Sequence, residues 1–448
     1  MSPHADTIRM RLSGGPLSAR QITDSIGVSQ PTISRALTAL GDEVVRIGGS
    51  QAIQYALRDT IRGLPDIGIH RVDAEGRIRQ LGVLVPVRTD GFVMRQEDGV
   101  IRHSNGLPWW LLDMRPQGYL GRAYAARHGA GLGLPARLAD WTDAHALRAL
   151  LAHGHDVVGN LLLGETARER FLAAPVPVPI AGEAVAEEYP RLAREAALGE
   201  RPGSSAGGEQ PKFTTCAMTP DGPRHVIVKF SEVEAGPVSE RWRDLLLAEH
   251  LALDTLREAG IPAARTRILE SRGGQRFLEV ERFDRIGNLG RRALISLTAL
   301  DAESAGLATG GWSVISRRLA IDGQIRPEAA DAADLLWAFG TLIGNTDMHN
   351  ANLSFVSELG RPYDIAPAYD MTPMAFAPRS GGGLPDTVSA ANIHASVGNE
   401  IWRRAETLAH AFLARLTAEP AFSHRFEPCI AALGHHIRTA STRIERLG

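Results

Sequence analysis

A chain of 448 residues is several times the usual size of one domain, so the sequence predicts two or more domains. Hydrophobic and charged fractions of 44% and 22% are ordinary for a globular protein, and no apolar run reaches the roughly 18 residues that a membrane span needs. The first twelve residues carry Asp6, Arg9 and Arg11, unlike a secretory signal, so we expect a cytoplasmic protein with no membrane partner. A net charge of -2 gives no general attraction to nucleic acid, and two distant cysteines indicate neither a disulfide framework nor a zinc site.

Residues 17–40 have the pattern of two short helices joined by a tight turn. Apolar positions recur at helical spacing after Leu17, and Ser18 can cap this first helix. Gly27 supplies the turn, and Ser29 can cap a second helix. Two helices joined by a glycine-containing turn are typical of the helix-turn-helix.

A hairpin with a glycine turn is expected over residues 44–56, which completes a winged helix-turn-helix domain over residues 1–62. A small helical packing module with an exposed polar face is the alternative interpretation. The order helix, turn, helix and hairpin favours DNA as the partner, and a homodimer would suit the paired half-sites that such domains usually read. The side chains expected to reach base edges or phosphates are Ser29, Gln30, Thr32, Ser34 and Arg35.

Residues 63–180 alternate short strands and helices with glycine and proline punctuation, which predicts a second unit. A proline-rich stretch over residues 175–179 marks its end, and a charged helical segment follows it. A third unit is expected over residues 181–285, and a mainly helical fourth unit over residues 286–448.

A glycine-rich segment, residues 203–212, precedes an expected strand that begins at Phe213. Glycines allow backbone N–H groups to face phosphate oxygens, and the neighbouring Lys212 adds a positive charge. The spacing matches neither the Walker A motif nor GxGxxG. A flexible linker is an equally good interpretation of this segment alone.

The next apolar strand, residues 225–230, carries Lys229 near its end. Protein kinases place a phosphate-binding lysine on such a strand and pair it with a glutamate of the following helix. The helix expected over residues 243–259 offers Glu249 for that pairing.

Asp347 precedes Asn352 by five residues, the spacing of a kinase catalytic loop, in which the aspartate accepts the proton of the substrate hydroxyl and the asparagine binds a metal ion. Asp370 follows eighteen residues later, after an expected strand. In a kinase the corresponding aspartate holds Mg²⁺, a hard cation that prefers oxygen ligands. Because the glycine loop, the lysine, the Asp–Asn pair and the second aspartate occur in kinase order, the sequence predicts a kinase that uses ATP and Mg²⁺.

Three segments resemble the HipA family of kinases: residues 205–212, residues 280–285, and residues 346–352, where a TDxH…N sequence replaces the HRD motif. Members with an additional N-terminal helix-turn-helix, called YjjJ-like, are similar in the whole architecture. The resemblance implies an α+β, two-lobed protein-kinase-like fold, here preceded by the winged helix-turn-helix domain. It also implies a serine/threonine kinase toxin of a toxin-antitoxin system, which acts on a protein such as a translation factor and has a HipB-like antitoxin as partner.

The resemblance also assigns roles to individual residues. Asp347 would deprotonate the substrate hydroxyl, and Asn352 and Asp370 would hold Mg²⁺. Residues 281–283 would form the hinge that contacts adenine. Ser205 is similar in position to the family serine whose autophosphorylation switches the kinase off, although Ser204 adjoins it. Together with catalytic Lys229, the expected ATP-binding residues are Ser205, Ala206, Gly207, Gly208, Lys212, Glu281, Arg282, Phe283, His349, Asn352 and Asp370.

Two departures from the family pattern bear on these expectations. Glu209 places a negative charge in the glycine loop, which would weaken ATP binding, and residues 297–306 contain Asp301 but lack the glutamine associated with substrate handling. Two other functions therefore stay open. One is a nucleotide-sensing DNA-binding regulator with an inactive kinase domain, and the other is a kinase of small molecules.

Overall fold

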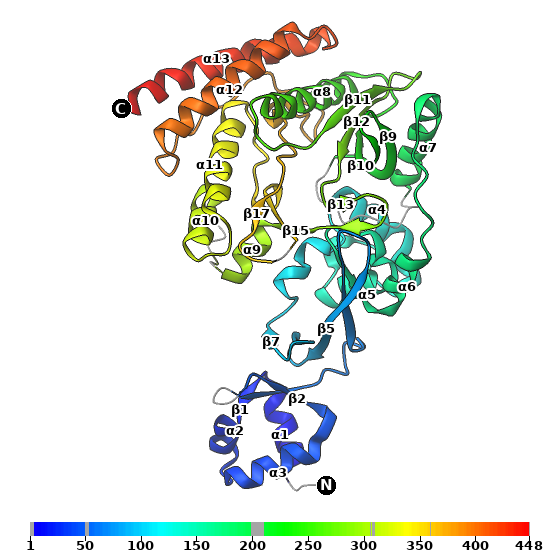
Figure 1. Ribbon diagram of the computed structural model, residues 1–448, viewed down its shortest axis with the longest axis vertical. Coiled ribbons are helices and arrows are strands. Elements are labelled where there is room, and N and C mark those ends of the chain that lie inside the picture. The colour runs from blue at the N-terminus through cyan, green and yellow to red at the C-terminus, as the bar shows by residue number, and fades with distance from the viewer. Residues whose placement is uncertain are drawn as a thin grey trace.

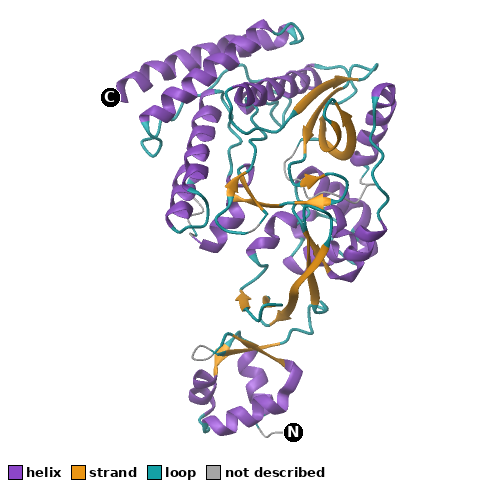
Figure 2. Ribbon diagram, viewed as in Figure 1, coloured by secondary structure: helices purple, strands orange, loops and turns teal. Residues whose placement is uncertain are grey.

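The computed structural model describes residues 4–49, 53–198, 210–304, 306, 310–358 and 360–447. The chain runs from an N-terminal unit at one end of the molecule, through a middle unit, to a sheet lobe and a helical lobe at the other end (Figure 1). Strands lie mainly in the centre, and long helices cover the far lobe (Figure 2). The α+β fold class predicted from the sequence is thus confirmed.

The N-terminal unit consists of three short helices and a three-stranded sheet in the order β1-β3-β2. Ser18 caps the second helix and forms a capping box with Gln21, as its position predicts. Gly27 ends that helix with φ 75°, a left-handed conformation that favours glycine. Ser29 stands at the N-cap of the third helix, but its hydroxyl pairs with that of Thr32 at 2.9 Å instead of capping a backbone N–H. The elements are α1 (Ala5–Leu12), β1 (Leu17–Ser18), α2 (Ala19–Ile26), α3 (Gln30–Leu40), β2 (Val44–Ile47) and β3 (Gln54–Leu57).

The hairpin of β2 and β3 packs against the sheet of the middle unit. Val45 and Ala56 share a buried cluster with Val85 and Val87 of β5 (Ile78–Val87). Arg58, just after the hairpin, forms an antiparallel bridge with Val87. The hairpin therefore connects the two units, while α3 lies on the side that faces away from the middle unit (Figure 1).

The middle unit is an antiparallel five-stranded sheet, in the order β7-β6-β5-β4-β8, with three helices. Helix α5 covers one face of the sheet, where Leu147 and Leu150 pack against Ile67, Leu84 and Phe92. The elements not yet given are β4 (Ile67–Val72), β6 (Gly91–Gln96), β7 (Ile101–Ser104), α4 (Gly118–His128), α5 (Asp143–His153), β8 (Leu161–Leu163) and α6 (Gly164–Ala173).

The sheet lobe places a four-stranded antiparallel sheet, in the order β11-β12-β10-β9, between two helices. Side chains alternate across a strand, so Phe277 packs with Tyr189 of α7, and the next residue, Leu278, packs with Leu246 of α8. The elements are α7 (Val185–Ala197), β9 (Lys212–Thr219), β10 (Gly222–Phe230), α8 (Pro237–Glu258), β11 (Thr266–Glu270) and β12 (Arg276–Glu281).

The helical lobe contains the largest core of the described residues, in which Phe339 of α11 packs with Trp402 and Phe412 of α12. A small sheet, in the order β15-β16-β17, lies between this core and the middle unit. The elements are β13 (Arg285–Ile286), β14 (Gly290–Arg291), β15 (Ala293–Ser296), α9 (Leu297–Ser304), α10 (Gly311–Ile321), α11 (Pro327–Leu342), β16 (Ser354–Ser357), β17 (Asp364–Ile365), α12 (Asn399–Ala418) and α13 (Glu427–Ile444).

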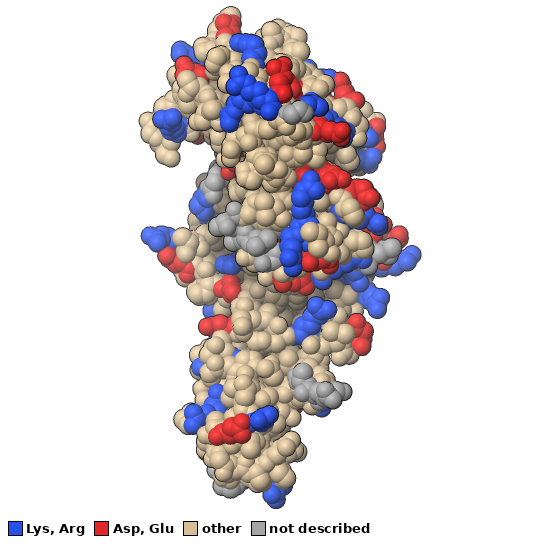
Figure 3. Space-filling view, turned by 90° about the vertical axis from the view of Figure 1, so that its left-hand side faces the viewer, with Lys and Arg blue, Asp and Glu red and all other residues tan. Residues whose placement is uncertain are grey.

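Acidic and basic side chains are interspersed over the face shown in Figure 3, in keeping with the small net charge. Among the described helices, none combines the length and the apolar composition that a membrane crossing would need.

Candidate active site

Strand β10 and helix α8 bring Lys229 and Glu249 together inside the sheet lobe. Val226 and Val228 point toward the core under α7, so the strand alternation directs Lys229 to the opposite face, toward α8. The Lys229 Nζ donates to both carboxylate oxygens of Glu249, at 2.6 and 2.7 Å. The Glu249 side chain is fully buried and also accepts a hydrogen bond from the Thr372 hydroxyl at 2.9 Å. The Glu249 carboxylate is thus bound by both Lys229 and Thr372.

Asp370 approaches the same lysine from the helical lobe, with 2.5 Å between Lys229 Nζ and Asp370 Oδ1. Burial lowers the pKa of Lys229, but the carboxylates of Asp370 and Glu249 outweigh burial and keep this pKa above its ordinary value. Asp370 has φ 54°, which is uncommon for any residue except glycine. The Asn345 side chain donates to the Asp370 carbonyl at 3.1 Å and supports this conformation. Strained backbone of this kind clusters at functional sites.

The loop after α11 carries Asp347, His349 and Asn352. The Asn352 Nδ2 donates to the Asp347 carbonyl at 2.8 Å, and the Asp347 N–H donates to the Asn345 side chain at 3.0 Å. The His349 Nε2 lies 3.8 Å from Asp347 Oδ1, and both side chains are about half exposed. These contacts hold Asp347 at the surface, where a second molecule can reach it.

A pocket of about 170 Å³ lies between the two lobes and brings most of the expected site residues together. One part of its wall is charged, and another part is apolar, with Ile227, Val280 and Leu294. Asp347 is not part of the wall. The sequence-predicted residues that line the pocket are Lys212, Lys229, Glu281, Arg282, Phe283, His349, Asn352 and Asp370.

Residues 281–283 connect β12 to the helical lobe along the apolar part of the pocket. The Phe283 ring lies 5.7 Å from that of Tyr369, centroid to centroid. The Arg282 side chain pairs with Asp284 through two hydrogen bonds of 3.0 Å. These are the residues for which the sequence predicts a hinge that contacts adenine.

The middle unit also contributes to the pocket, which sequence reasoning missed. Asp113, Gln117 and Val158 line the wall beside residues of both lobes. Asp113 accepts hydrogen bonds from the backbone N–H and the hydroxyl of Ser296, at 2.7 and 2.6 Å, just before α9. No spacing in the sequence could indicate this, because Asp113 and Ser296 are 183 residues apart.

The structure describes the glycine-rich segment only at its end, residues 210–212. Lys212 is buried at the start of β9, with 3% of its surface exposed, and lines the pocket. Ser205, Ala206, Gly207 and Gly208 lie outside the described residues.

The two predicted magnesium ligands, Asn352 and Asp370, both line this pocket. Amide and carboxylate oxygens suit Mg²⁺, which usually takes only one or two protein ligands and completes its shell with water and phosphate oxygens. Among the described residues, no group of three or more His, Cys, Asp or Glu side chains could form a metal site by itself. The donor set therefore fits a magnesium ion bound together with a nucleotide.

Helix α3 carries four of the predicted DNA-contacting residues, and the fifth, Ser29, stands at its N-cap. Ser29, Gln30, Ser34 and Arg35 are exposed, and Thr32 is half-buried. They occupy the N-terminal half of the helix and its outer face, while Ile33 packs inward. A helix with exposed polar side chains along one face can place these side chains in a DNA groove.

Comparison with known proteins identifies the family of this chain. Residues 64–172 match a family model described as the YjjJ-like toxin middle domain, and residues 204–437 match the HipA-like C-terminal domain. The chain is 38% identical over 436 residues to Toxin YjjJ of Escherichia coli strain K12, and the aligned region covers 97% of this chain and 98% of that protein.

Two solved structures are more distantly similar. A HipA, HipB and operator DNA complex of Shewanella oneidensis MR-1 matches with 16% identity and a TM-score of 0.46, over 85% of this chain and 97% of that chain. The Helicobacter pylori proinflammatory kinase CtkA matches with 16% identity and a TM-score of 0.37, over 53% of this chain and 93% of that chain.

Two lobes with a lysine–glutamate pair and a pocket between them define a protein-kinase-like α+β fold. The chain belongs to the HipA-like family of toxins, and its whole length is similar to the YjjJ-like members.

Proposed function

We propose that this protein is an ATP-dependent serine/threonine protein kinase that acts as a toxin. The observation that carries this proposal is the buried contact of Lys229 with both Glu249 and Asp370, on the wall of a pocket that also contains Asn352. In kinases, a lysine–glutamate pair and a metal-binding aspartate must both be in place for phosphoryl transfer.

Each residue then has a defined task. Lys229 contacts the nucleotide phosphates, and Glu249 and Thr372 hold its ammonium group in place. Asp347 accepts the proton of a serine or threonine hydroxyl, whose oxygen forms a bond to the γ-phosphorus while the bond to the ADP oxygen breaks. Asp370 and Asn352 hold Mg²⁺, which neutralises negative charge on the phosphates. The hinge at residues 281–283 contacts the adenine.

Further parts of the proposal concern regulation. Autophosphorylation of Ser205, or of the adjacent Ser204, would inactivate the enzyme. The N-terminal unit would bind operator DNA through α3 and repress its own promoter, as a homodimer and with a HipB-like antitoxin as a possible partner. A translation factor is the proposed protein substrate, and the cytoplasm is the proposed location.

The test is phosphate incorporation by intact mass and phosphopeptide mapping, after incubation of dephosphorylated protein with ATP and Mg²⁺. We expect a phosphate on Ser204 or Ser205 in the parent protein and none in Asp347→Ala. Asp364→Asn is a matched control, because Asp364 lies close by on β17 but pairs with Arg326 at 2.7 Å outside the site. No phosphate in either protein would favour the nucleotide-sensing regulator instead, and an equal amount in the parent and in Asp347→Ala would refute the catalytic role of Asp347.

A further inference from the structure

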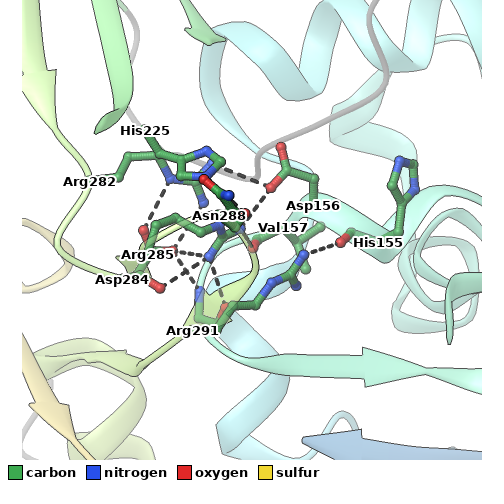
Figure 4. Close-up of polar contacts among 10 residues, drawn as sticks. His155, Asp156, Val157, His225, Arg282, Asp284, Arg285, Asn288 and Arg291 are labelled. Atoms are coloured by element: carbon green, nitrogen blue, oxygen red, sulfur yellow. Dashed lines mark hydrogen bonds and ion pairs between the residues drawn. The ribbon is translucent and has the colours of Figure 1, made fainter. Parts of the chain in front are cut away.

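A cluster of three arginines lies behind the hinge, where the hairpin of β13 and β14 meets the middle unit. Arg282, Arg285 and Arg291 converge there with Asp156 and Asp284 (Figure 4). Arg282 also lines the nucleotide pocket, so the cluster is directly connected to the hinge.

Two of the arginines are fully paired. The Arg282 Nη2 and the Arg285 Nη1 donate to Asp284 Oδ2, at 3.0 and 2.8 Å. The Arg285 Nη2 donates to Asp156 Oδ1 at 2.8 Å, and the Arg282 Nη1 lies 3.5 Å from the same oxygen. Both aspartates are therefore already engaged by Arg282 and Arg285.

Arg291 has no carboxylate partner among the described residues. Its Nη2 donates to the His155 carbonyl, its Nη1 makes no hydrogen bond, and its guanidinium lies over the Phe171 ring at 4.7 Å. Only 5% of the residue is exposed. Burial, followed by repulsion from Arg285, lowers the pKa of Arg291 to about 9. Three positive charges thus face two negative ones, and one buried charge stays uncompensated.

A pocket of about 350 Å³ opens onto these arginines. Asp156 is the single acidic residue among the described residues in its wall. His155 and His225 also line it, and burial lowers the pKa of both imidazoles, which keeps them neutral at pH 7. The exposed residue Asn288 also lines the pocket. The site is thus accessible and positively charged.

We propose that this pocket binds a phosphate group, as inorganic phosphate or as a phosphomonoester. An uncompensated buried charge is costly, and an anion would neutralise it. Guanidinium groups match phosphate oxygens through paired hydrogen bonds, so phosphate here would bind Arg291 and would compete with Asp156 and Asp284 for Arg282 and Arg285. Because Arg282 belongs to both pockets, phosphate at this site would change the pairing of a hinge residue and thereby the affinity for nucleotide.

The experiment is isothermal titration of the full-length Lys229→Met protein with inorganic phosphate, at constant ionic strength. This background removes the lysine that would attract phosphate in the nucleotide pocket. Arg291→Met removes the unpaired charge, and Asn288→Asp adds a carboxylate of almost the same size to the pocket wall, where it repels a bound anion. Arg276→Met is the matched control, because Arg276 is equally buried but is neutralised by Glu270.

We expect phosphate to bind the Lys229→Met protein and the control, and Arg291→Met and Asn288→Asp to lose about tenfold or more in affinity. If Arg291→Met fails to fold, Asn288→Asp decides. The same titration with O-phosphoserine distinguishes the sources, because tighter binding than phosphate indicates a phosphorylated side chain and weaker binding indicates free phosphate. We expect a dissociation constant of ~1 mM or tighter, so the absence of binding at phosphate concentrations up to about 20-fold above that value would overturn the proposal. Equal binding by Asn288→Asp would also overturn it.

Discussion

The contact between Lys229 and Glu249 leads to a quantitative prediction about stability. In Lys229→Met, the fully buried Glu249 carboxylate loses its counterion. Removal of one partner of a buried ion pair typically costs about 3–5 kcal/mol, because the other charge stays buried without compensation. Asp370 loses the same counterion, but its side chain is 26% exposed and can be hydrated. Most of the cost should therefore arise at Glu249.

A second substitution separates this charge effect from lost packing. Adding Glu249→Leu to Lys229→Met removes the uncompensated carboxylate, so we expect the double variant to recover more than half of the lost stability. Neither variant should transfer phosphate, because both lack the phosphate-contacting lysine. If the double variant recovers stability but not activity, the loss of stability in Lys229→Met is due to the uncompensated Glu249 carboxylate.

The assay is backbone hydrogen exchange of α8 (Pro237–Glu258), because this helix carries Glu249 and reports opening of the sheet lobe. A cost of about 3 kcal/mol corresponds to an increase in exchange on the order of a hundredfold. Equal exchange in Lys229→Met and the parent protein would refute the reasoning. So would a double variant that is less stable than Lys229→Met, since that result would mean that packing and not charge dominates.

Three other predictions concern separate parts of the molecule. Asn352→Ala should raise the Mg²⁺ concentration needed for autophosphorylation, whereas Asn350→Ala in the same loop should not; an equal shift in both would remove Asn352 from the metal site. Arg35→Ala should weaken operator binding about tenfold, measured by fluorescence anisotropy, and should make the salt dependence of this binding shallower. Arg438→Ala on α13 serves as the control. Unchanged binding by Arg35→Ala would show that this face of α3 does not contact the operator. Burial, with Arg170 and His128, lowers the pKa of His153 to about 4, so the unfolded chain binds this proton more readily and stability should fall as pH drops from about 6.5 to about 4. Thermal melts across this range should show a smaller loss in His153→Gln, and parallel curves would contradict the assignment.

Much of the candidate site could be predicted because its residues lie in short segments with a fixed order. Lys229 on its strand, the spacing from Asp347 to Asn352, and Asp370 beyond them are all local features, and the structure brings Lys229, Asn352 and Asp370 to one pocket. The helix caps at Ser18 and Gly27 were also predictable, since capping depends on a few neighbouring residues. The first helix, α1, was missed although its buried Ala5, Ile8 and Leu12 recur at helical spacing, because a periodic pattern over only 8 residues is too short to stand out.

The sequence by itself therefore determined the helix caps near the N-terminus, the order of the segments that resemble a kinase and the family of the protein. Tertiary structure alone decided that Asp113 and Gln117 of the middle unit line the pocket between the two lobes and that the N-terminal hairpin packs against β5. It also decided that, within the described part of the chain, Arg291 lies beside the paired Arg282 and Arg285 without a carboxylate partner of its own. Local order follows from backbone and capping preferences within a few residues, whereas these contacts join segments more than a hundred residues apart or in different units, and only the packed core determines which of them meet.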